Sequence, residues 1–378
     1  MARVKLIQEK TDLPEQYHDV FDGMASLRGR ISGPSSVVLH SPELAQVWNE
    51  ISLFLHLSSI VEPEYAELAV CISARQFDCG YVWSAHAPAA LQAGVSQPAV
   101  EAIANHRDPD DLTPAQLDVV HYARQLGRDR RTDQSTFDAL LQAHGPRWLV
   151  ELTAWIGRYS ALTCVLNTFD VQAAPDRLTL PSMPSPASTT APSVPQDPRV
   201  RLLTNRSDVE ADGVAISDEI GGSRGNVRGP FALLMYAPPL AKAVLDLAVY
   251  LRLDRCISAS TRELAVIATA RERDCSYVWA AHAPAARKEG VADETIAAVR
   301  DRGAVAAGSR EADVIELVRS LMRSHRVDQA LFDRLMATHG LQGLVELCAV
   351  IGHYLCVTTL LNAFEVPPAA GAELLPLP

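Results

Sequence analysis

The chain of 378 residues lacks an excess of basic residues and lacks a long apolar run free of charges and breaks. No stretch of about 18 residues meets the requirements of a membrane span, and the first ten residues contain no apolar core of the kind that a secretory signal needs. Lysine and arginine number 34 against 45 aspartates and glutamates, a net charge of −11 without a basic cluster. We therefore expect a cytoplasmic protein that binds neither nucleic acid nor a membrane.

Cysteine is also scarce, and its number, seven, is odd. The sequence has no HExxH pair and no set of paired CxxC motifs, so we expect no metal site. Two cysteines, Cys79 and Cys275, occupy matching positions of the repeat described below. The other five are expected to be small buried hydrophobic residues in a reducing compartment: Cys71, Cys164, Cys256, Cys348 and Cys356.

Alternating strand patterns are missing as well, whereas helix signals are frequent. Thr113-Pro114 and Thr132-Asp133 each precede a run with helical apolar spacing, and His144-Gly145 closes the second of these runs. The run after Gly145 is apolar on most faces, as a central bundle helix would be. We predict an all-α protein with about six to eight helices in each half.

The most informative feature that is present is an internal duplication with an offset of 196 residues. Residues 67–90 and 263–286 are identical at 17 of 24 positions without a gap. The proposed boundaries are a first domain over residues 1–173, a linker over 174–198 and a second domain over 199–372. The linker holds 7 of the 24 prolines and no apolar periodicity, which is typical of an extended, semi-rigid connection between two separately folded domains.

A glutamate begins each repeated segment. Ser260 and Glu263 have the spacing of a capping box, which would give the glutamate a purely structural role. The position that matches Ser260 is Glu64, which cannot supply the hydroxyl half of the box. Because Glu67 is present where the capping explanation weakens, we favour a functional carboxylate in both copies.

A cysteine, a tryptophan and a histidine follow at helical spacing. Asp78 and Asp274 are suitable N-caps, which would place Cys79 and Cys275 in the first turn of a helix, where backbone N–H groups favour a thiolate. The histidines, His86 and His282, follow seven residues later on the same stripe. They lie too far from the thiols for a direct hydrogen bond, so we expect the thiol, the imidazole and the glutamate carboxylate to converge on one shared cavity.

The remaining candidates flank these groups. The histidines are favoured as general acids or bases over packing residues. Pro88 and Pro284 lie two residues beyond them and would free a backbone carbonyl if the helix continues. Aromatic residues of the same segment are candidate walls of the substrate site, with a place in the core as the alternative: Tyr81, Trp83, Tyr277 and Trp279.

The pattern Glu-x11-Cys-x6-His followed by Ala-Pro-Ala-Ala resembles the carboxymuconolactone decarboxylase and alkylhydroperoxidase-D-like superfamily. The resemblance covers nearly the full length of both halves. It implies all-α domains that assemble into trimers or hexamers, so that three tandem chains would form a hexamer-like ring. It assigns the proton relay to Glu67 and Glu263, the cysteine position to Cys79 and Cys275, and the histidine to His86 and His282.

The two branches of that superfamily imply different chemistry. In the peroxidase branch a second cysteine resolves the first, but here the matching positions hold Val82 and Val278. A single-cysteine peroxidase would need an external thiol. The decarboxylase branch implies loss of carbon dioxide from a small lactone or organic acid of aromatic catabolism, with the histidine delivering a proton. A carboxylate substrate also needs a cation, for which Arg28 and its counterpart Arg224 are candidates, with solvated surface arginines as the alternative.

We therefore predict a cofactor-independent, carboxymuconolactone decarboxylase-like carbon–carbon lyase that acts on a small-molecule carboxylate or lactone. The alternatives are a thiol peroxidase that uses Cys79 or Cys275, and a non-catalytic binding or scaffold protein. The expected assembly is a homo-oligomer, with a trimer of tandem chains favoured. Differences between the copies, such as Arg158 against His353, leave open whether both sites are active.

Overall fold

The computed structural model describes residues 2–26, 29–174, 176–181, 183, 188, 194–253, 256–305 and 308–376. These residues form helices and loops without a strand, which confirms the predicted all-α fold class. The helices of the first copy are α1 (His18–Ala25), α2 (Pro34–Val38), α3 (Pro42–Leu57), α4 (Pro63–Gln76), α5 (Gly80–Gln92), α6 (Gln97–Ala104), α7 (Pro114–Arg128) and α8 (Gln134–Thr168).

The second copy repeats these helices in the same order. They are α9 (Val214–Arg224), α10 (Pro230–Leu234), α11 (Pro238–Leu253), α12 (Ala259–Glu272), α13 (Ser276–Lys288), α14 (Asp293–Arg300), α15 (Arg310–Arg323) and α16 (Gln329–Ala363). Short 3₁₀ turns precede the first helix of each copy: η1 (Lys10–Asp12), η2 (Glu15–Tyr17), η3 (Arg206–Asp208) and η4 (Ala211–Gly213).

Local signals in the sequence set several helix boundaries. Thr113 caps α7 with a reciprocal capping box to Gln116, and the Asp133 side chain caps α8, as their positions predicted. Gly145 adopts a left-handed φ of 80° and interrupts α8, so the helical run does end there before a second one begins. Gly340 interrupts α16 in the same way, with a φ of 67°.

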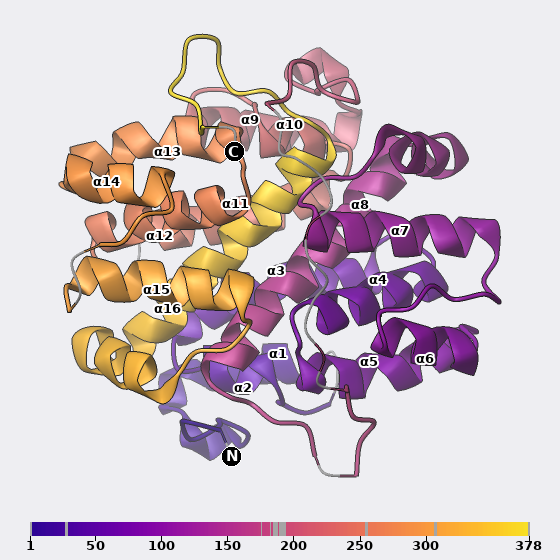
Figure 1. Cartoon of the computed structure of the whole chain (residues 1–378), viewed down its shortest axis with the longest axis horizontal. Coiled ribbons are helices and arrows are strands. Elements are labelled where there is room, and N and C mark those ends of the chain that lie inside the picture. The colour runs from indigo at the N-terminus through magenta and orange to yellow at the C-terminus, as the bar shows by residue number, and fades with distance from the viewer. Residues whose placement is uncertain are drawn as a thin grey trace.

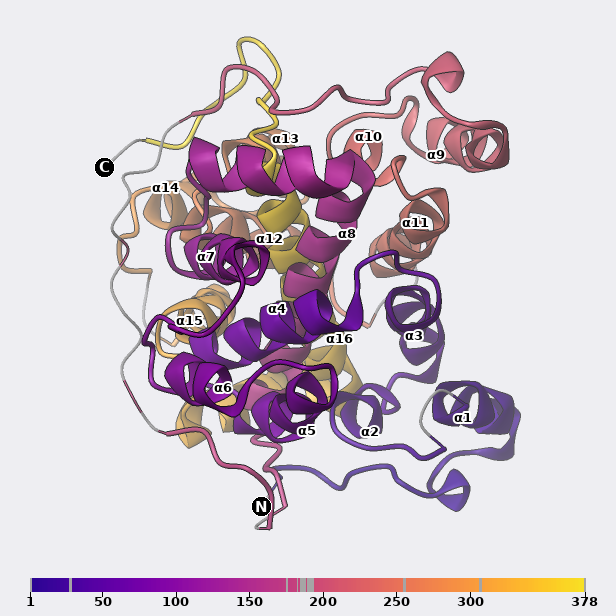
Figure 2. The ribbon, with the colours of Figure 1, turned by 90° about the vertical axis from the view of Figure 1, so that its right-hand side faces the viewer.

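The two copies share one hydrophobic core, in which the apolar second parts of α8 and α16 pack along each other. In Figure 1, α4–α7 lie to the right of this central pair and α12–α15 to the left; Figure 2 shows the same centre from the side. Helices α3 and α11 form a second contact between the copies. The proposed domain boundaries stay a prediction, but the copies are not independent bodies, because each covers the central helix of the other.

Contacts between the copies come in reciprocal pairs, as across a twofold axis. Arg3 lies over the Phe332 ring and donates to the Val327 carbonyl, whereas Arg199 lies over the Phe137 ring and donates to the Thr132 carbonyl. The aromatic pairs Phe137–Phe364 and Phe169–Phe332 are likewise related. The duplicated chain therefore packs like a symmetric dimer whose subunits are joined covalently.

The central crossing depends on glycine. A Cβ added to Gly157 would lie 2.7 Å from Cys356 Sγ and 3.0 Å from its Cα, so the helices would have to separate. We expect Gly157→Ala to lower the free energy of unfolding by about 1–3 kcal/mol, the usual result of overpacking. Gly23→Ala is the matched control, because Gly23 lies in α1 with nothing within 4 Å of the added Cβ. Equal urea midpoints for the two variants would contradict a close crossing.

The structure corrects two expectations, one about a membrane span and one about the unmatched cysteines. The expectation that no segment has the length and composition of a membrane span was wrong for helix α16, but 89% of its apolar window is buried inside the protein, as in a central core helix. Of the five unmatched cysteines, Cys71, Cys164 and Cys348 are buried and Cys356 is half-buried. The expectation was wrong for Cys256, which is exposed because it lies in the loop before α12, where its backbone N–H is bonded to Glu346.

Candidate functional site

A glutamate and a histidine meet in each copy. Glu67 on α4 and His86 on α5 are joined by a hydrogen bond of 2.8 Å between Oε2 and Nδ1. Glu263 on α12 and His282 on α13 repeat the contact at 2.7 Å. The helix pair α4–α5, like α12–α13, packs closely enough to bring residues 19 positions apart into one dyad. The predicted convergence of carboxylate and imidazole is therefore present twice.

The capping explanation for Glu263 does not hold. Helix α12 is capped by Ser258, whose Oγ accepts from the Thr261 N–H, so Ser260 already lies within the helix. The Glu263 carboxylate instead accepts from His282 and from the neighbouring Arg262. Burial favours its neutral form, but the hydrogen bond and charge of His282, followed by those of Arg262, outweigh burial and lower its pKa. Glu263 is therefore held as a carboxylate beside the imidazole.

The carboxylate also orients the imidazole. A carboxylate at Nδ1 favours the tautomer with its proton on Nδ1, which leaves Nε2 as the free basic nitrogen. In the second copy this Nε2 lies 3.3 Å from the hydroxyl of Tyr354 on α16. Burial, and then the charge of Glu263, raise the pKa of Tyr354, so its hydroxyl keeps its proton. Carboxylate, imidazole and phenol thus form one hydrogen-bonded chain.

The hydrogen-bonded chain of Glu263, His282 and Tyr354 ends at a cavity of about 570 Å³ in the second copy. His282, Tyr354 and Tyr277 form part of its wall, and its other walls are mostly apolar. Pro284 lies within α13 and supplies no N–H to the carbonyl of Ala280, which also lines the cavity. The space suits a small organic molecule held next to a basic nitrogen.

Three arginines line the same cavity, from three separate parts of the second copy. Arg224 ends α9, Arg228 lies in the loop before α10, and Arg252 belongs to the last turn of α11. The Arg224 guanidinium lies over the Phe231 ring, and its Nε is buried without a partner among the described residues. The sequence did not establish that the loop of Arg224 reaches the histidine; the structure brings them to one cavity. Three guanidinium groups make this cavity attractive to carboxylates.

The matching region of the first copy differs. Its cavity is only about 50 Å³, with Ser32 and His56 where the second copy has Arg228 and Arg252. Arg158 occupies the position of His353, lies over the Trp48 ring and donates to the Trp48 carbonyl. The His86 side chain is 7% exposed, against 24% for His282. Arg28, the counterpart of Arg224, falls outside the described residues.

The cysteines are arranged differently from the prediction. Cys79 and Cys275 are themselves the N-caps of α5 and α13. The preceding residues, Asp78 and Asp274, adopt left-handed φ values of 47° and 49° and cap neither helix. Asp78 binds Arg326 of the second copy, and Asp274 binds Arg130 of the first. The aspartates therefore join the two copies, and the cysteines precede the helical stripe on which the histidines lie.

Both thiols are buried and favour the protonated form. Burial raises the pKa of Cys79 to about 12 and that of Cys275 to about 11, although the backbone N–H groups of the next helical turn act in the opposite direction. Cys79 lines a separate cavity of about 360 Å³, and Cys275 is not among the described residues that line the cavity of His282. We expected the thiol and the imidazole of each copy to line one cavity. In neither of these two cavities do they meet.

The aromatic candidates divide in the same way. Trp83 and Trp279 are 2% and 0% exposed and belong to the core, so their expected place in the pocket wall is not observed. Tyr277 does line the cavity of His282, whereas Tyr81 lines the cavity of Cys79. Both tyrosines pack against a glycine at which a Cβ would meet the ring: Gly33 for Tyr81 and Gly229 for Tyr277.

Sequence reasoning missed three residues of the second site. Tyr354 was visible as a matched position in the repeat, opposite Tyr159, but nothing in the sequence indicated its contact with the histidine. Arg228 and Arg252 have no arginine counterpart in the first copy, so the repeat gives no indication of them. Among the described residues, no group of three or more histidine, cysteine, aspartate or glutamate side chains could hold a metal ion.

Comparison with known proteins identifies the two copies. The model of the carboxymuconolactone decarboxylase family matches the chain twice, over residues 42–125 and 238–319. These regions run from α3 into α7 and from α11 into α15, and they contain both glutamate–histidine dyads. No curated protein matches the chain. The two matches fall on the two copies of the repeat, which supports a tandem duplication of this family's domain.

Proposed function

We propose that this chain, in which two tandem regions match the carboxymuconolactone decarboxylase family, is a cofactor-independent carbon–carbon lyase. Its substrate is a small lactone or organic acid that carries a carboxylate, and its chemistry takes place in the second copy. The observation that carries the proposal is the hydrogen-bonded chain of Glu263, His282 and Tyr354, which opens onto a cavity lined by three arginines.

The proposed reaction begins with the substrate bound as an anion. Arg224, Arg228 and Arg252 supply the positive charge that holds it and that offsets charge developing on a neighbouring carbonyl oxygen. The bond between the substrate carbon and its carboxylate then breaks, carbon dioxide leaves, and the electron pair moves into that carbonyl. A proton must finally return to the carbon, so the net reaction consumes one proton for each carbon dioxide released.

His282 is the proposed donor of that proton. With Nδ1 bonded to Glu263, its Nε2 faces the cavity and Tyr354, and an imidazolium formed there is stabilised by the adjacent carboxylate. Tyr354 stays protonated and can position the imidazole or pass on a proton. Each group in the chain thus has a role that needs neither a metal nor an organic cofactor.

The thiol peroxidase alternative has less support. A peroxidatic cysteine reacts as a thiolate within reach of its oxidant. Here burial raises the pKa of both thiols, and each matching resolving position holds a valine. We therefore expect Cys275→Ser and Cys79→Ser to retain lyase turnover within about threefold, because neither thiol is proposed to transfer the proton.

The test is a paired assay of the purified full chain. Carbon dioxide release is measured on a panel of five-membered lactones bearing one or two carboxylates, and peroxide consumption is measured with dithiothreitol as reductant. Release of carbon dioxide that survives both cysteine substitutions supports the lyase. Peroxide turnover that disappears in Cys79→Ser or Cys275→Ser, with no carbon dioxide released from any lactone, would overturn it in favour of the peroxidase.

A further inference from the structure

A second large cavity, of about 520 Å³, lies between the two copies and away from His282. It is lined by matching positions of both copies, so it lies on their approximate twofold axis. The matched pairs are Gln76 with Glu272, Phe77 with Arg273, and Arg128 with Arg323. Such a cavity exists only because the copies pack together, and the proposed lyase chemistry makes no use of it.

The lining of this cavity is strongly cationic. Five arginines line it against two carboxylates, Asp108 and Glu272. The arginines are Arg124, Arg128, Arg130, Arg273 and Arg323. Three histidines also face the cavity: His106, His121 and His325. Such an excess of positive charge is unusual in a chain whose net charge is −11.

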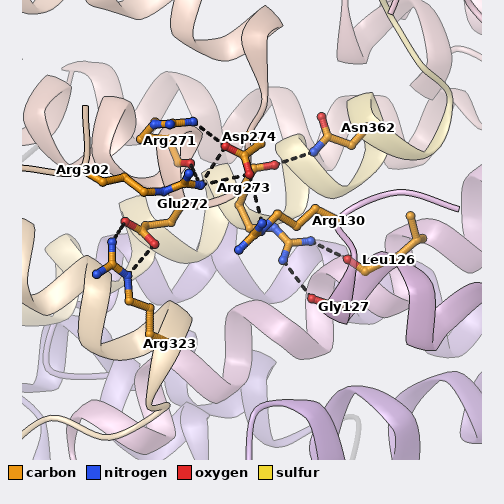
Figure 3. Close-up of polar contacts among 10 residues, drawn as sticks. All are labelled: Leu126, Gly127, Arg130, Arg271, Glu272, Arg273, Asp274, Arg302, Arg323 and Asn362. Atoms are coloured by element: carbon orange, nitrogen blue, oxygen red, sulfur yellow. Dashed lines mark hydrogen bonds and ion pairs between the residues drawn. The ribbon is translucent and has the colours of Figure 1, made fainter. Parts of the chain in front are cut away.

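The next layer adds two carboxylates, Asp129 beside Arg128 and Asp274 beside Arg130, but it also adds Arg271 and Arg302, so an excess of positive charge persists. Figure 3 shows Glu272 bound by Arg323, and Asp274 bound by Arg271 and Arg302. Arg130, which belongs to the first copy, also donates to the Asp274 carboxylate, at a distance of 3.0 Å. The acidic side chains drawn there are therefore already shared among several arginines. Guanidinium groups that share carboxylates in a partly buried place repel one another.

Arg273 is the most buried cation of the set. It is 5% exposed, and both hydrogen bonds of its guanidinium within the described part of the chain go to backbone carbonyls, those of Leu126 and Gly127 at the end of α7. Its Nε is buried without a partner among the described residues. Burial, and then the charge of Arg130, lower the pKa of Arg273 to about 9. An anion in the adjacent cavity would relieve this repulsion.

We propose that the cavity between the copies binds a small multivalent anion with phosphate or carboxylate groups. Arginines of both copies, Arg128 and Arg130 from one and Arg323 from the other, surround it. Planar guanidinium groups suit either kind of oxyanion, because they can donate two parallel hydrogen bonds. A ligand that contacts both copies also stabilises their packing, since it binds the folded chain and not the unfolded one.

The test is isothermal titration calorimetry of the full chain at low ionic strength. The affinities for pyrophosphate and for citrate are measured in separate titrations. The cavity of His282 also contains arginines, so the titrations are done in the Arg228→Gln, Arg252→Gln background, where binding there is weakened. Binding of either anion in this background supports the site, and the stronger of the two identifies the preferred group. Failure of both anions to bind overturns the proposal without bearing on lyase turnover.

Arg323→Gln, added to that background, is expected to weaken binding roughly tenfold or more, which corresponds to the loss of one charge-assisted hydrogen bond. Arg334→Gln is the matched control: Arg334 is 50% exposed and pairs with Asp313 of α15, much as Arg323 is 48% exposed and pairs with Glu272. Arg128→Gln is a second variant, in case Arg323→Gln loses its fold by circular dichroism. The site would be overturned if the folded variant, Arg323→Gln or Arg128→Gln, bound the anion as tightly as the control Arg334→Gln.

Discussion

Replacing His282 with alanine is expected to lower kcat by about 10²–10⁴-fold, the contribution typical of a general acid or base. The loss should fall mainly on kcat, because the arginines that hold the substrate stay in place. Added imidazole should restore part of the activity, since removing the side chain enlarges a cavity of about 570 Å³ beside Glu263. The measurement is carbon dioxide release on the best substrate of the panel, with and without imidazole.

His86→Ala is the matched control for this variant. It removes the same kind of dyad from the first copy, where the corresponding cavity is about 50 Å³. We expect its turnover to stay within about twofold of the parent chain. A large loss in His86→Ala with none in His282→Ala would move the active site to the first copy. Full activity in both variants would refute acid–base catalysis by these histidines.

The sequence predicted the dyads because both partners recur at the same spacing. It could not predict the separation of Cys275 from His282, because the argument from a helical stripe applies only within a helix. Cys275 is the N-cap, with an extended backbone, and its thiol is buried. The arginines of the cavity were missed for the opposite reason. Arg228 and Arg252 distinguish the copies, so a comparison that rewards identity gives them no weight.

The fold shows a similar division between what was predictable and what was not. Capping residues such as Thr113 and Asp133 act locally, so they set helix boundaries that can be predicted from the sequence. A proline-rich linker suggests separate bodies, whereas the packing joins α8 to α16 in one core. The sequence did contain one indication: the part of α8 after Gly145 is apolar on most faces, which is typical of a helix covered on all sides.

Replacing Asp274 with asparagine is expected to lower the free energy of unfolding by about 3 kcal/mol, because it leaves the buried Arg271 and two half-buried arginines without their counter-charge. Asp274 is 6% exposed and accepts from Arg271, Arg302 and Arg130, the last of which belongs to the other copy. Asparagine is the informative substitution, since it keeps the size of the side chain and tolerates the left-handed φ of 49° at this position. The loss is measured from urea unfolding at neutral pH.

Asp78→Asn is the control on the other side of the twofold axis. Its side chain is 15% exposed and pairs with two arginines, Arg75 and Arg326, of which Arg326 is 67% exposed. Solvent screens the pair with Arg326, and the buried Arg75 keeps the Ala104 and Pro181 carbonyls as partners, so we expect a loss of about 1 kcal/mol. Because Asp274 ties the first copy to the second, its variant should also become more sensitive to salt, as free anions screen the released arginines. A loss for Asp274→Asn that is no larger than about 1 kcal/mol would show that the charge cluster around Asp274 adds little to the packing of the copies.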